Sequence, residues 1–442
     1  MRVLAVDLGA SSARVASVDL DRRPPVMKIL RRYRHGPVRH HDGTLRWDWE
    51  RLNQEVLAGL QLGLRGGRVA SIGVDTWGVD YGLLDSHGDL LSPPFSYRDD
   101  RTAGWGQVAD RLGRQHLYCT TGTQLMGMNT IFQLAAHDPA ELAGAAKLLM
   151  LPELVVYRLT GEMVGERTSA GTTGLVSLET GAWSEQLLDE IGLDGRVFPP
   201  LRSAPEQVGA WQGVPVHLVG GHDTSSAVVA MSGAPQEGAA FASIGTWVLV
   251  GMERRTPLTS YGAFAANFSN EAGAVGGVRF LKNLAGLWLL EESWREWGRS
   301  HLGDLIDLAG AIQAHGPTIE VNDPRFIAPP SMVQEIIDAS GLGQAAHPAV
   351  IVRCILDSIA GAVGRAIDEL EEVTGVHVTE IHVLGGGTRN RLLLKLIEAA
   401  TGRPLREGPA EATVMGNALV QGMALGRYAN LDEARCALSP VD

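Results

Sequence analysis

Lysine and cysteine are scarce in this chain of 442 residues. Lysine occurs only at positions 28, 147, 282 and 395, so nearly all of the positive charge is arginine. The three cysteines, Cys119, Cys354 and Cys436, are odd in number, widely spaced and form no Cys-x-x-Cys pair. This pattern excludes a disulfide framework and a zinc knuckle.

The sequence also has no excess of basic charge and no long apolar run. Its net charge is -12, which argues against nucleic acid and against an anionic membrane as partners. No run of 18 apolar residues occurs, and the apolar stretch 148–157 is interrupted by Pro152 and Glu153. The first residues, MRVLAVDLG, place Asp7 where a signal peptide would need apolar residues. We therefore expect a cytoplasmic chain, present as a monomer or a homodimer.

The composition is that of a folded protein with two domains. Hydrophobic residues make up 45% of the chain and glycine occurs 54 times, and this length exceeds what one core usually serves. Strand patterns and helix patterns alternate, which is typical of an α/β fold. Apolar residues at helix spacing predict a helix with a stripe from Trp49 to Leu64 and a long helix with a stripe from Ile351 to Leu370 that ends at Gly375, and residues 69–85 read as strand, turn and strand. The turn-rich stretch 233–238 marks the expected boundary, so we predict domains at 1–232 and 233–442.

Two segments have the same pattern of a strand, a turn of small residues and a second strand. The first is VLAVDLGASSARVASVDLD near the N-terminus, and the second is GAAFASIGTWVLVGME at 238–253. Each predicts a hairpin. Together they favour two domains built on one plan, although two unrelated hairpins would give the same pattern.

The first turn contains the groups that a phosphate site needs. Gly9 and the residues that follow it supply backbone N–H groups and hydroxyls, and Arg14 lies just beyond the turn. Asp7 ends the first strand and could hold Mg²⁺ through water. The alternative is a plain hairpin in which Asp7 caps the turn.

Asp223 is the candidate base. It follows the short strand PVHLVGG and opens the helix HDTSSAVVAM, at the strand end where α/β proteins bind ligands. A kinase for an alcohol needs a carboxylate beside the attacking hydroxyl, but an aspartate at this position is also a common helix cap. His222 could contact a sugar or be an ordinary histidine. Trp77 and Gly78 lie on a loop, where turn chemistry is the alternative.

Three glycines, 385–387, follow the apolar strand IHVL and precede a helix. They permit close approach of a flat ligand such as adenine or ribose. The pattern is not Gly-x-Gly-x-x-Gly, and no acidic residue follows at the spacing of a ribose partner. This argues against a dinucleotide-dependent dehydrogenase.

In this order, these segments resemble the FGGY carbohydrate kinase family over essentially the whole chain. The resemblance rests on AVDLGASSARV, DGTLRWDW, SIGVDTWGVDY, YRDDRT, LLMLPELVVYRLTGE, GGHDTSSAV, SIGTW, AANFSNEAGAVGGVRFLKNLAGLWLL, VLGGGTRN and GPAEATVMGNALVQGMA. It implies two actin-like, ribonuclease-H-type domains, with ATP and a sugar in the cleft between them.

The resemblance also implies roles for individual residues. Asp7 would serve Mg²⁺, and Asp223 would be the catalytic base. The implied contacts to ATP are Ala10, Ser11, Ser12, Ala13, Arg14, Thr246, Glu291 and Gly386. The implied contacts to the sugar are Trp77, Gly78, His222, Asp223, Thr224 and Asn283.

Two positions depart from the family pattern. Glu291 stands where glutamine is expected after LWLL, and a carboxylate near a nucleotide is less favourable than an amide. Ala13 stands where glycine is usual, which would limit the turn's access to positive φ.

The expected activity is ATP-dependent phosphorylation of a ketose. DTWGVDY and LKNLAGLWLL point to the rhamnulose branch of the family, which would convert L-rhamnulose into its 1-phosphate. Alternatives are a kinase for L-fuculose, xylulose or ribulose, and an ATP-dependent sugar sensor on the same fold. A sensor needs no base, so Asp223 favours the enzyme.

Overall fold

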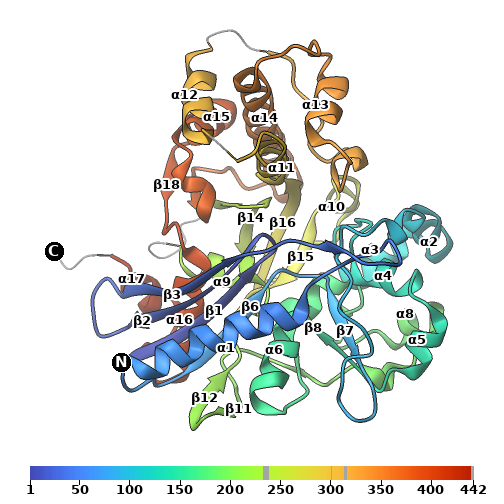
Figure 1. Ribbon diagram of the computed structural model, residues 1–442, viewed down its shortest axis with the longest axis vertical. Helices are drawn as coiled ribbons and strands as arrows, with labels where there is room; N and C mark the ends of the chain where they lie inside the picture. The colour runs from blue at the N-terminus through green and yellow to red at the C-terminus, as the bar shows by residue number, and fades with distance from the viewer. Residues whose placement is uncertain (232–237, 300, 313–315, 440–442) are drawn as a thin grey trace. The chain divides into compact units, whose positions relative to one another are not determined.

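The computed structural model of the chain describes residues 1–231, 238–299, 301–312 and 316–439 (Figure 1). Two compact units are present. The first comprises Met1–Pro235, Glu253–Phe280 and Glu411–Asp442, and the second Gln236–Met252 and Leu281–Ala410. The first unit thus includes two segments that follow residue 232. The domain limits 1–232 and 233–442 stay a prediction, and their boundary stretch lies outside the described residues except for Gly238.

The first unit is built on a six-stranded sheet with the order β11-β12-β6-β1-β2-β3. Its central strand β1 (Arg2–Gly9) pairs antiparallel with β2 (Ser12–Asp19) and parallel with β6 (Ile72–Thr76). Residues 3–8 of β1 are all buried, as expected of a strand covered on both faces. The remaining strands are β3 (Val26–Arg34), β11 (Gln207–Trp211) and β12 (Val214–His217).

Helices from distant parts of the chain pack on this sheet. In α1 (Trp49–Arg65) the predicted apolar stripe is buried from Trp49 to Leu60, and the helix packs against β2 and β3. Helix α16 (Ala412–Ala424) packs against β1, β6 and α9 (Asp223–Val229). A Cβ at Gly416 would lie 1.7 Å from the carbonyl oxygen of Ser226, so only glycine lets α16 approach α9 so closely.

Besides this sheet, the first unit contains an antiparallel strand pair and a number of short elements. β7 (Tyr81–Leu84) follows β6 after a turn, as predicted, but it pairs with β8 (Lys147–Met150) rather than with β6. The other elements are β4 (Val38–Arg39), β5 (Leu45–Arg46), α2 (Trp105–Leu112), α3 (Arg114–Thr121), α4 (Thr130–Ala135), α5 (Pro139–Gly144), α6 (Leu151–Thr160), β9 (Gly165–Glu166), α7 (Arg167–Ala170), α8 (Glu185–Glu190), β10 (Leu201–Arg202), α10 (Tyr261–Ala265), β15 (Ser269–Ala272) and α17 (Leu431–Cys436).

The second unit has its own sheet. β13 (Ala239–Ile244) pairs antiparallel with β14 (Trp247–Arg254) and parallel with β17 (Glu380–Leu384), which pairs in turn with β18 (Leu405–Glu407). β16 (Val278–Ala285) follows β14 in the strand order. The second predicted hairpin is therefore present, and the alternation of strands and helices in both units confirms the α/β class.

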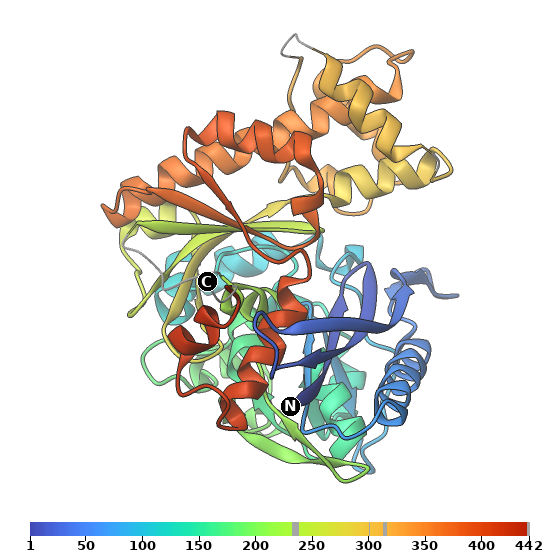
Figure 2. The same cartoon turned by 90° about the vertical axis from the view of Figure 1, so that its left-hand side faces the viewer.

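Helix α14 (Pro348–Thr374) dominates the helical part of the second unit and runs beside α15 (Arg391–Thr401) (Figure 2). The predicted stripe from Ile351 to Leu370 is buried, and the helix ends at Gly375, whose φ is 69°, in the usual left-handed cap. The shorter helices are α11 (Trp288–Glu296), α12 (Leu302–Ala311) and α13 (Met332–Ser340). No helix in the described parts of the chain is long and apolar enough to cross a membrane.

Candidate active site

The first turn is tighter than the sequence pattern indicates. Gly9 and Ser12 are paired strand residues, so only Ala10 and Ser11 form the turn, and Ala13 and Arg14 lie in β2. The positive-φ residues of the chain do not include Ala13. Alanine is therefore unstrained here, which corrects the expectation that the missing glycine limits the turn.

Asp7 lies at the centre of a buried network of charges. The strand register places it opposite Arg14, whose Nη1 is 3.4 Å from its Oδ2. Arg14 also donates to Glu411, which accepts a second bond of 2.8 Å from Arg32. Burial raises the pKa of Asp7, and the charge of Arg14 opposes this shift. Sequence reasoning missed Glu411, which lies 397 residues from Arg14 in the chain.

A second buried aspartate stands beside Asp7. Asp75 is the register partner of Asp7 on β6, and its Oδ2 accepts a 2.5 Å bond from Nδ2 of Asn417 on α16. Burial and the nearby charge of Asp7 raise the pKa of Asp75 well above its usual value. The motif VDTWGVD contains Asp75, but nothing in its local pattern marked it as a site residue.

The carboxylates fit the predicted Mg²⁺. Oδ2 of Asp7 and Oδ1 of Asp75 are buried and make no hydrogen bond, so each could accept one from water in a hydrated ion's shell. No group of three or more acidic, histidine or cysteine side chains with metal-binding geometry occurs in the described parts of the chain. Mg²⁺ commonly keeps several waters and takes only one or two protein carboxylates, so a sparse donor set suits it.

Asp223 is the first residue of α9, and His222 occupies the cap position without a side-chain cap bond. The aspartate is therefore not the cap residue itself. Its Oδ1 accepts a 3.2 Å bond from Oγ1 of Thr224, and its side chain is 26% exposed. Burial raises the pKa of Asp223, while the neighbouring His222 and Arg279 oppose this shift.

Glu166 fixes the backbone just before Asp223. Its Oε2 accepts bonds from the amides of Gly221, Thr168 and Ser169 at 2.9 to 3.1 Å. The hydroxyl of Thr168 accepts a 3.1 Å bond from the amide of His222. Behind this carboxylate, Oε1 of Glu153 accepts a 2.7 Å bond from the amide of Glu166. Burial raises the pKa of Glu153 to about 8, so Glu153 is mostly protonated at neutral pH.

Trp77 and Gly78 are held by buried partners. The indole N–H of Trp77 donates to Asp80 at 3.0 Å, and Trp77 is 5% exposed. A Cβ at Gly78 would lie 2.9 Å from Thr172, so close packing alone favours glycine here. Burial raises the pKa of Asp80 to about 6. Sugar contacts by Trp77 and Gly78 stay predictions.

A histidine that sequence reasoning missed connects Trp77 with the first turn. Nε2 of His35 is 2.9 Å from the carbonyl oxygen of Gly9. Its ring centroid lies 5.6 Å from those of both Trp47 and Trp77. Burial lowers the pKa of His35 to about 4, so the ring is neutral at physiological pH.

In the second unit, the turn between β13 and β14 is fixed by backbone bonds. The carbonyl of Thr246 accepts bonds of 3.1 and 3.2 Å from the amides of Gly286 and Trp288. The carbonyl of Gly245 accepts a 2.9 Å bond from Leu287. These donors lead directly into α11, so the predicted phosphate residue Thr246 lies beside the start of that helix.

The glycines 385–387 reach the same turn. A Cβ at Gly385 would lie 2.9 Å from the carbonyl oxygen of Ile244, and a Cβ at Gly387 would lie 2.1 Å from Cγ2 of Ile244. A Cβ at Gly386 would have open space around it. Two of the three glycines are therefore explained by packing on β13, while Gly386 leaves room for another molecule.

The other two predicted residues of the second unit lie on neighbouring elements. Glu291 is in the first turn of α11, and its carboxylate lies 3.4 Å from Arg299. Arg299 thus neutralises part of the charge that distinguishes Glu291 from the family's glutamine. Asn283 lies on β16, where its carbonyl accepts a 3.5 Å bond from Asn322. Nucleotide and sugar contacts by these two residues stay predictions.

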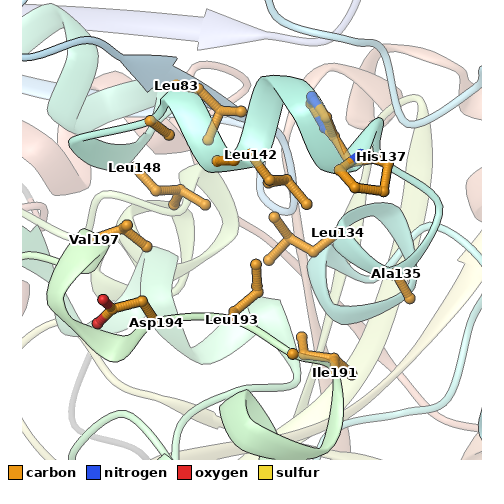
Figure 3. A pocket seen from close by; sticks show the side chains of 14 residues that line it. Leu83, Leu134, Ala135, His137, Leu142, Leu148, Ile191, Leu193, Asp194 and Val197 are labelled. Carbon is orange, nitrogen blue, oxygen red and sulfur yellow. The ribbon is translucent and has the colours of Figure 1, made fainter.

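A separate pocket of about 370 Å³, with many apolar side chains in its walls, lies elsewhere in the first unit (Figure 3). Its walls come from β7, β8, α4, α5 and the segment after α8, and they include Leu83, Leu134, Leu142, Ile191 and Leu193. The residues that line it include none of the predicted site residues. The pocket is therefore distinct from the aspartate cluster.

Asp7 and Asp75 lie on neighbouring strands of the first sheet, and Asp223 lies close enough to raise the pKa of both. Carboxylates gathered in this way suit an enzyme that transfers a phosphoryl group. The N-terminal domain model of the FGGY family of carbohydrate kinases matches residues 2–231, and the C-terminal domain model matches residues 240–425. The chain therefore belongs to the FGGY family of carbohydrate kinases, which use ATP.

Curated relatives cover nearly the whole chain. A rhamnulokinase of Pectobacterium carotovorum is 40% identical over 99% of this chain and 91% of its own length. A rhamnulokinase of Klebsiella pneumoniae is 40% identical over 98% of this chain and 91% of its own.

Solved structures with low identity share the fold. A xylulose kinase from Lactobacillus acidophilus has a TM-score of 0.78 at 16% identity, covering 100% of this chain and 93% of its own. A Plasmodium falciparum glycerol kinase with ADP has a TM-score of 0.78 at 15% identity, with the same coverage of each chain. These likenesses confirm the predicted two-domain α/β fold.

Proposed function

We propose that this chain transfers the γ-phosphoryl group of ATP to L-rhamnulose and gives L-rhamnulose 1-phosphate and ADP. The substrate assignment is supported by 40% identity to two rhamnulokinases over 98 to 99% of the chain. The observation that carries the chemistry is Asp223, a partly exposed carboxylate at the start of α9. Its position at a strand end beside two buried aspartates suits a group that acts on a substrate hydroxyl.

In this proposal Asp223 is the base. The terminal hydroxyl of the ketose gives its proton to the carboxylate as its oxygen bonds to the γ-phosphorus, and the bond between phosphorus and the leaving oxygen of ADP breaks. The shift of the Asp223 pKa above its usual value makes the carboxylate a better proton acceptor. The transition state is loose, so positioning and charge neutralisation supply most of the acceleration.

The turn residues Ala10 and Ser11 and the strand residues Ser12, Ala13 and Arg14 are proposed to face the phosphates. Asp7, with Asp75 beside it, would hold hydrated Mg²⁺, which when bound neutralises phosphate charge. Arg14 is tied to Asp7 and Glu411, so its charge is fixed in place before a substrate binds. Such preorganised charge is the main electrostatic means of stabilising a transition state.

The second unit is proposed to bind the nucleotide. Thr246 would contact phosphate, and the open space at Gly386 would accept adenosine. For the sugar, we propose His222, Thr224, Gly78, Trp77 and Asn283 as contacts. The cytoplasmic location and the monomeric or dimeric state stay predictions.

A ketose panel tests the substrate. Purified protein is given ATP, Mg²⁺ and one sugar at a time in a coupled ADP assay, with L-rhamnulose, L-fuculose, xylulose and ribulose compared by kcat/KM. We expect L-rhamnulose to give the highest value by at least about tenfold, since one misplaced polar group costs on that order. A higher value for another ketose would overturn the substrate. ATP binding without sugar-stimulated ADP release would favour a sensor.

A further inference from the structure

A buried ion pair lies behind the proposed base. Glu271 on β15 and Arg279 on β16 are 3% and 1% exposed, and Nη2 of Arg279 donates to Oε2 of Glu271 at 3.0 Å. Both residues belong to the first unit. Burial would raise the pKa of Glu271, but the charge of Arg279 and the hydrogen bond with His222 hold it at about 2. The glutamate is therefore ionised at every physiological pH.

The pair meets one nitrogen of His222. Nδ1 of the ring is 3.3 Å from Nη2 of Arg279 and 3.3 Å from Oε2 of Glu271. One neighbour is a donor and the other an acceptor, so the ring nitrogen has a partner whether or not it carries a proton. Arg279 is itself fixed, because its Nε donates to the carbonyl of Ala272 at 3.1 Å.

The other ring nitrogen faces the base. Nε2 of His222 is 3.5 Å from Oδ1 of Asp223, and Oγ1 of Thr224 donates to the same oxygen at 3.2 Å. Both contacts therefore fall on Oδ1. This leaves Oδ2 as the oxygen of Asp223 to which neither neighbour is directed.

Stability alone gives a weak reason for this arrangement. A buried ion pair often contributes little, and apolar residues of similar volume are frequently as stable or more so. Here the buried pair contacts one ring nitrogen of His222, and the other ring nitrogen faces the proposed base. Contacts arranged in this order can fix the orientation of the histidine ring. Histidines in catalytic sites take their ring orientation from such a second partner.

We propose that Glu271 and Arg279 are positioning residues, which fix the ring of His222 against Oδ1 of Asp223 and so leave Oδ2 to receive the sugar's hydroxyl proton. This inference rests on the proposed function, in which Asp223 is the base. Neither residue touches the sugar. Each acts on turnover through His222.

A double-mutant cycle tests this. Glu271→Gln, His222→Gln and the double variant are compared by kcat and by KM for ATP. We expect Glu271→Gln to lower kcat by about tenfold, with KM for ATP unchanged, and the double variant to be no slower than His222→Gln alone. Losses that multiply would overturn the inference, because Glu271 would then act independently of His222. An unchanged kcat in Glu271→Gln would overturn it as well.

A second variant covers a folding failure of the first. Arg279→Lys keeps the positive charge but carries all its donors on one nitrogen, so it does not reproduce the separate bonds that Nε makes to Ala272 and Nη2 makes to Glu271. In the otherwise unaltered protein, we expect Arg279→Lys to lower kcat about as much as Glu271→Gln does. In the His222→Gln background we expect no further loss. An equal loss of kcat in both backgrounds would overturn the inference. The matched control is Glu55→Gln, which removes another buried glutamate paired with arginines and should leave kcat unchanged.

The outcome of the proposed function is read separately. Asp223→Asn is assayed in the same series. Near-normal turnover in that variant would show that Asp223 is not the base, whatever the result of the double-mutant cycle. A slow Asp223→Asn with a multiplicative cycle would overturn only the positioning chain. Thermal midpoints of all variants establish that the differences in kcat are measured on folded protein.

Discussion

The two hairpins have the same backbone plan, but the first has charged side chains where the second has uncharged ones. Two positions before the turn glycine, the first hairpin has Asp7, which faces Arg14 across the strands. At the same position the second hairpin has Ser243, which faces Leu249. The first turn is surrounded by carboxylates and arginines from β1, β2, β3 and from Glu411, which lies just before α16. The second turn is surrounded by backbone amides at the start of α11.

From this difference we expect a division of tasks between the two units. Fixed charges in the first unit can neutralise phosphate and take up a proton. Backbone groups and an unfilled space at Gly386 in the second unit can bind a nucleotide without a charged side chain. With this division, substitutions in the first unit should lower kcat, and those in the second should raise KM for ATP.

The largest effect is expected at Asp223. Asp223→Asn keeps the shape of the side chain but removes the proton acceptor, so kcat should fall by about a thousandfold. Calorimetric titration should show ATP binding close to that of the unaltered protein, because the nucleotide contacts are proposed to lie mainly in the second unit. A variant with near-normal turnover in the coupled ADP assay would remove Asp223 from the mechanism.

The comparison of hairpins is tested directly by Asp7→Asn and Ser243→Ala. The first removes a carboxylate from the proposed Mg²⁺ position and should lower kcat by about a hundredfold, with a raised requirement for Mg²⁺. The second removes a hydroxyl at the equivalent step of the other hairpin and should change kcat by less than about threefold. Kinetics over a range of Mg²⁺ concentrations measure both. Equal losses would show that the two hairpins do not differ in task.

Substitutions at Gly386 and Gly387 distinguish a loss of nucleotide binding from a loss of packing in the second unit. Gly386→Leu fills the open space and should raise KM for ATP by about tenfold while the thermal midpoint stays near that of the unaltered protein. Gly387→Ala forces a Cβ against Ile244 and should cost about 1 to 3 kcal/mol of stability. Steady-state kinetics and thermal unfolding distinguish these effects. A Gly386→Leu protein with unchanged KM would contradict the adenosine contact.

A separate effect, on the pH dependence of stability rather than on turnover, comes from the buried Glu153. Its pKa is about 8 in the folded state and near 4.5 when unfolded, so the folded chain binds more protons between these values. Stability therefore falls as pH rises from about 4.5 to about 8, by at most about 1.4 kcal/mol per pH unit. In Glu153→Gln this part of the slope should disappear.

Urea unfolding at pH 5, 6, 7 and 8 measures that slope. Glu55→Gln is the control. The partners of Glu55 lower its pKa in the folded chain, so Glu55 is mainly ionised in both the folded and the unfolded chain over this range. The control should therefore keep the slope of the unaltered protein. Equal slopes for Glu153→Gln and the unaltered protein would mean that Glu153 is ionised in the fold.

The sequence by itself predicted both hairpins, the stripe of α1, the long helix that ends at Gly375 and the strand–glycine–helix unit at 380–401. These features depend on side-chain periodicity and turn chemistry within a few residues. It also marked Asp7 and Asp223, since each lies at or near a strand end where α/β folds place ligands. The bounds of the first turn were less accurate, because pairing between strands decides where a turn stops.

Only the tertiary structure brought distant partners to these residues. Asn417 reaches Asp75 across 342 positions of the chain, and Glu411 reaches Arg14 across 397, because α16 packs against β1 and β6. Glu271 and Arg279 reach His222 in the same way, from two later strands. A local pattern reveals what a residue type can do, but the pKa of a buried carboxylate and the orientation of a histidine depend on neighbours that only the folded chain supplies.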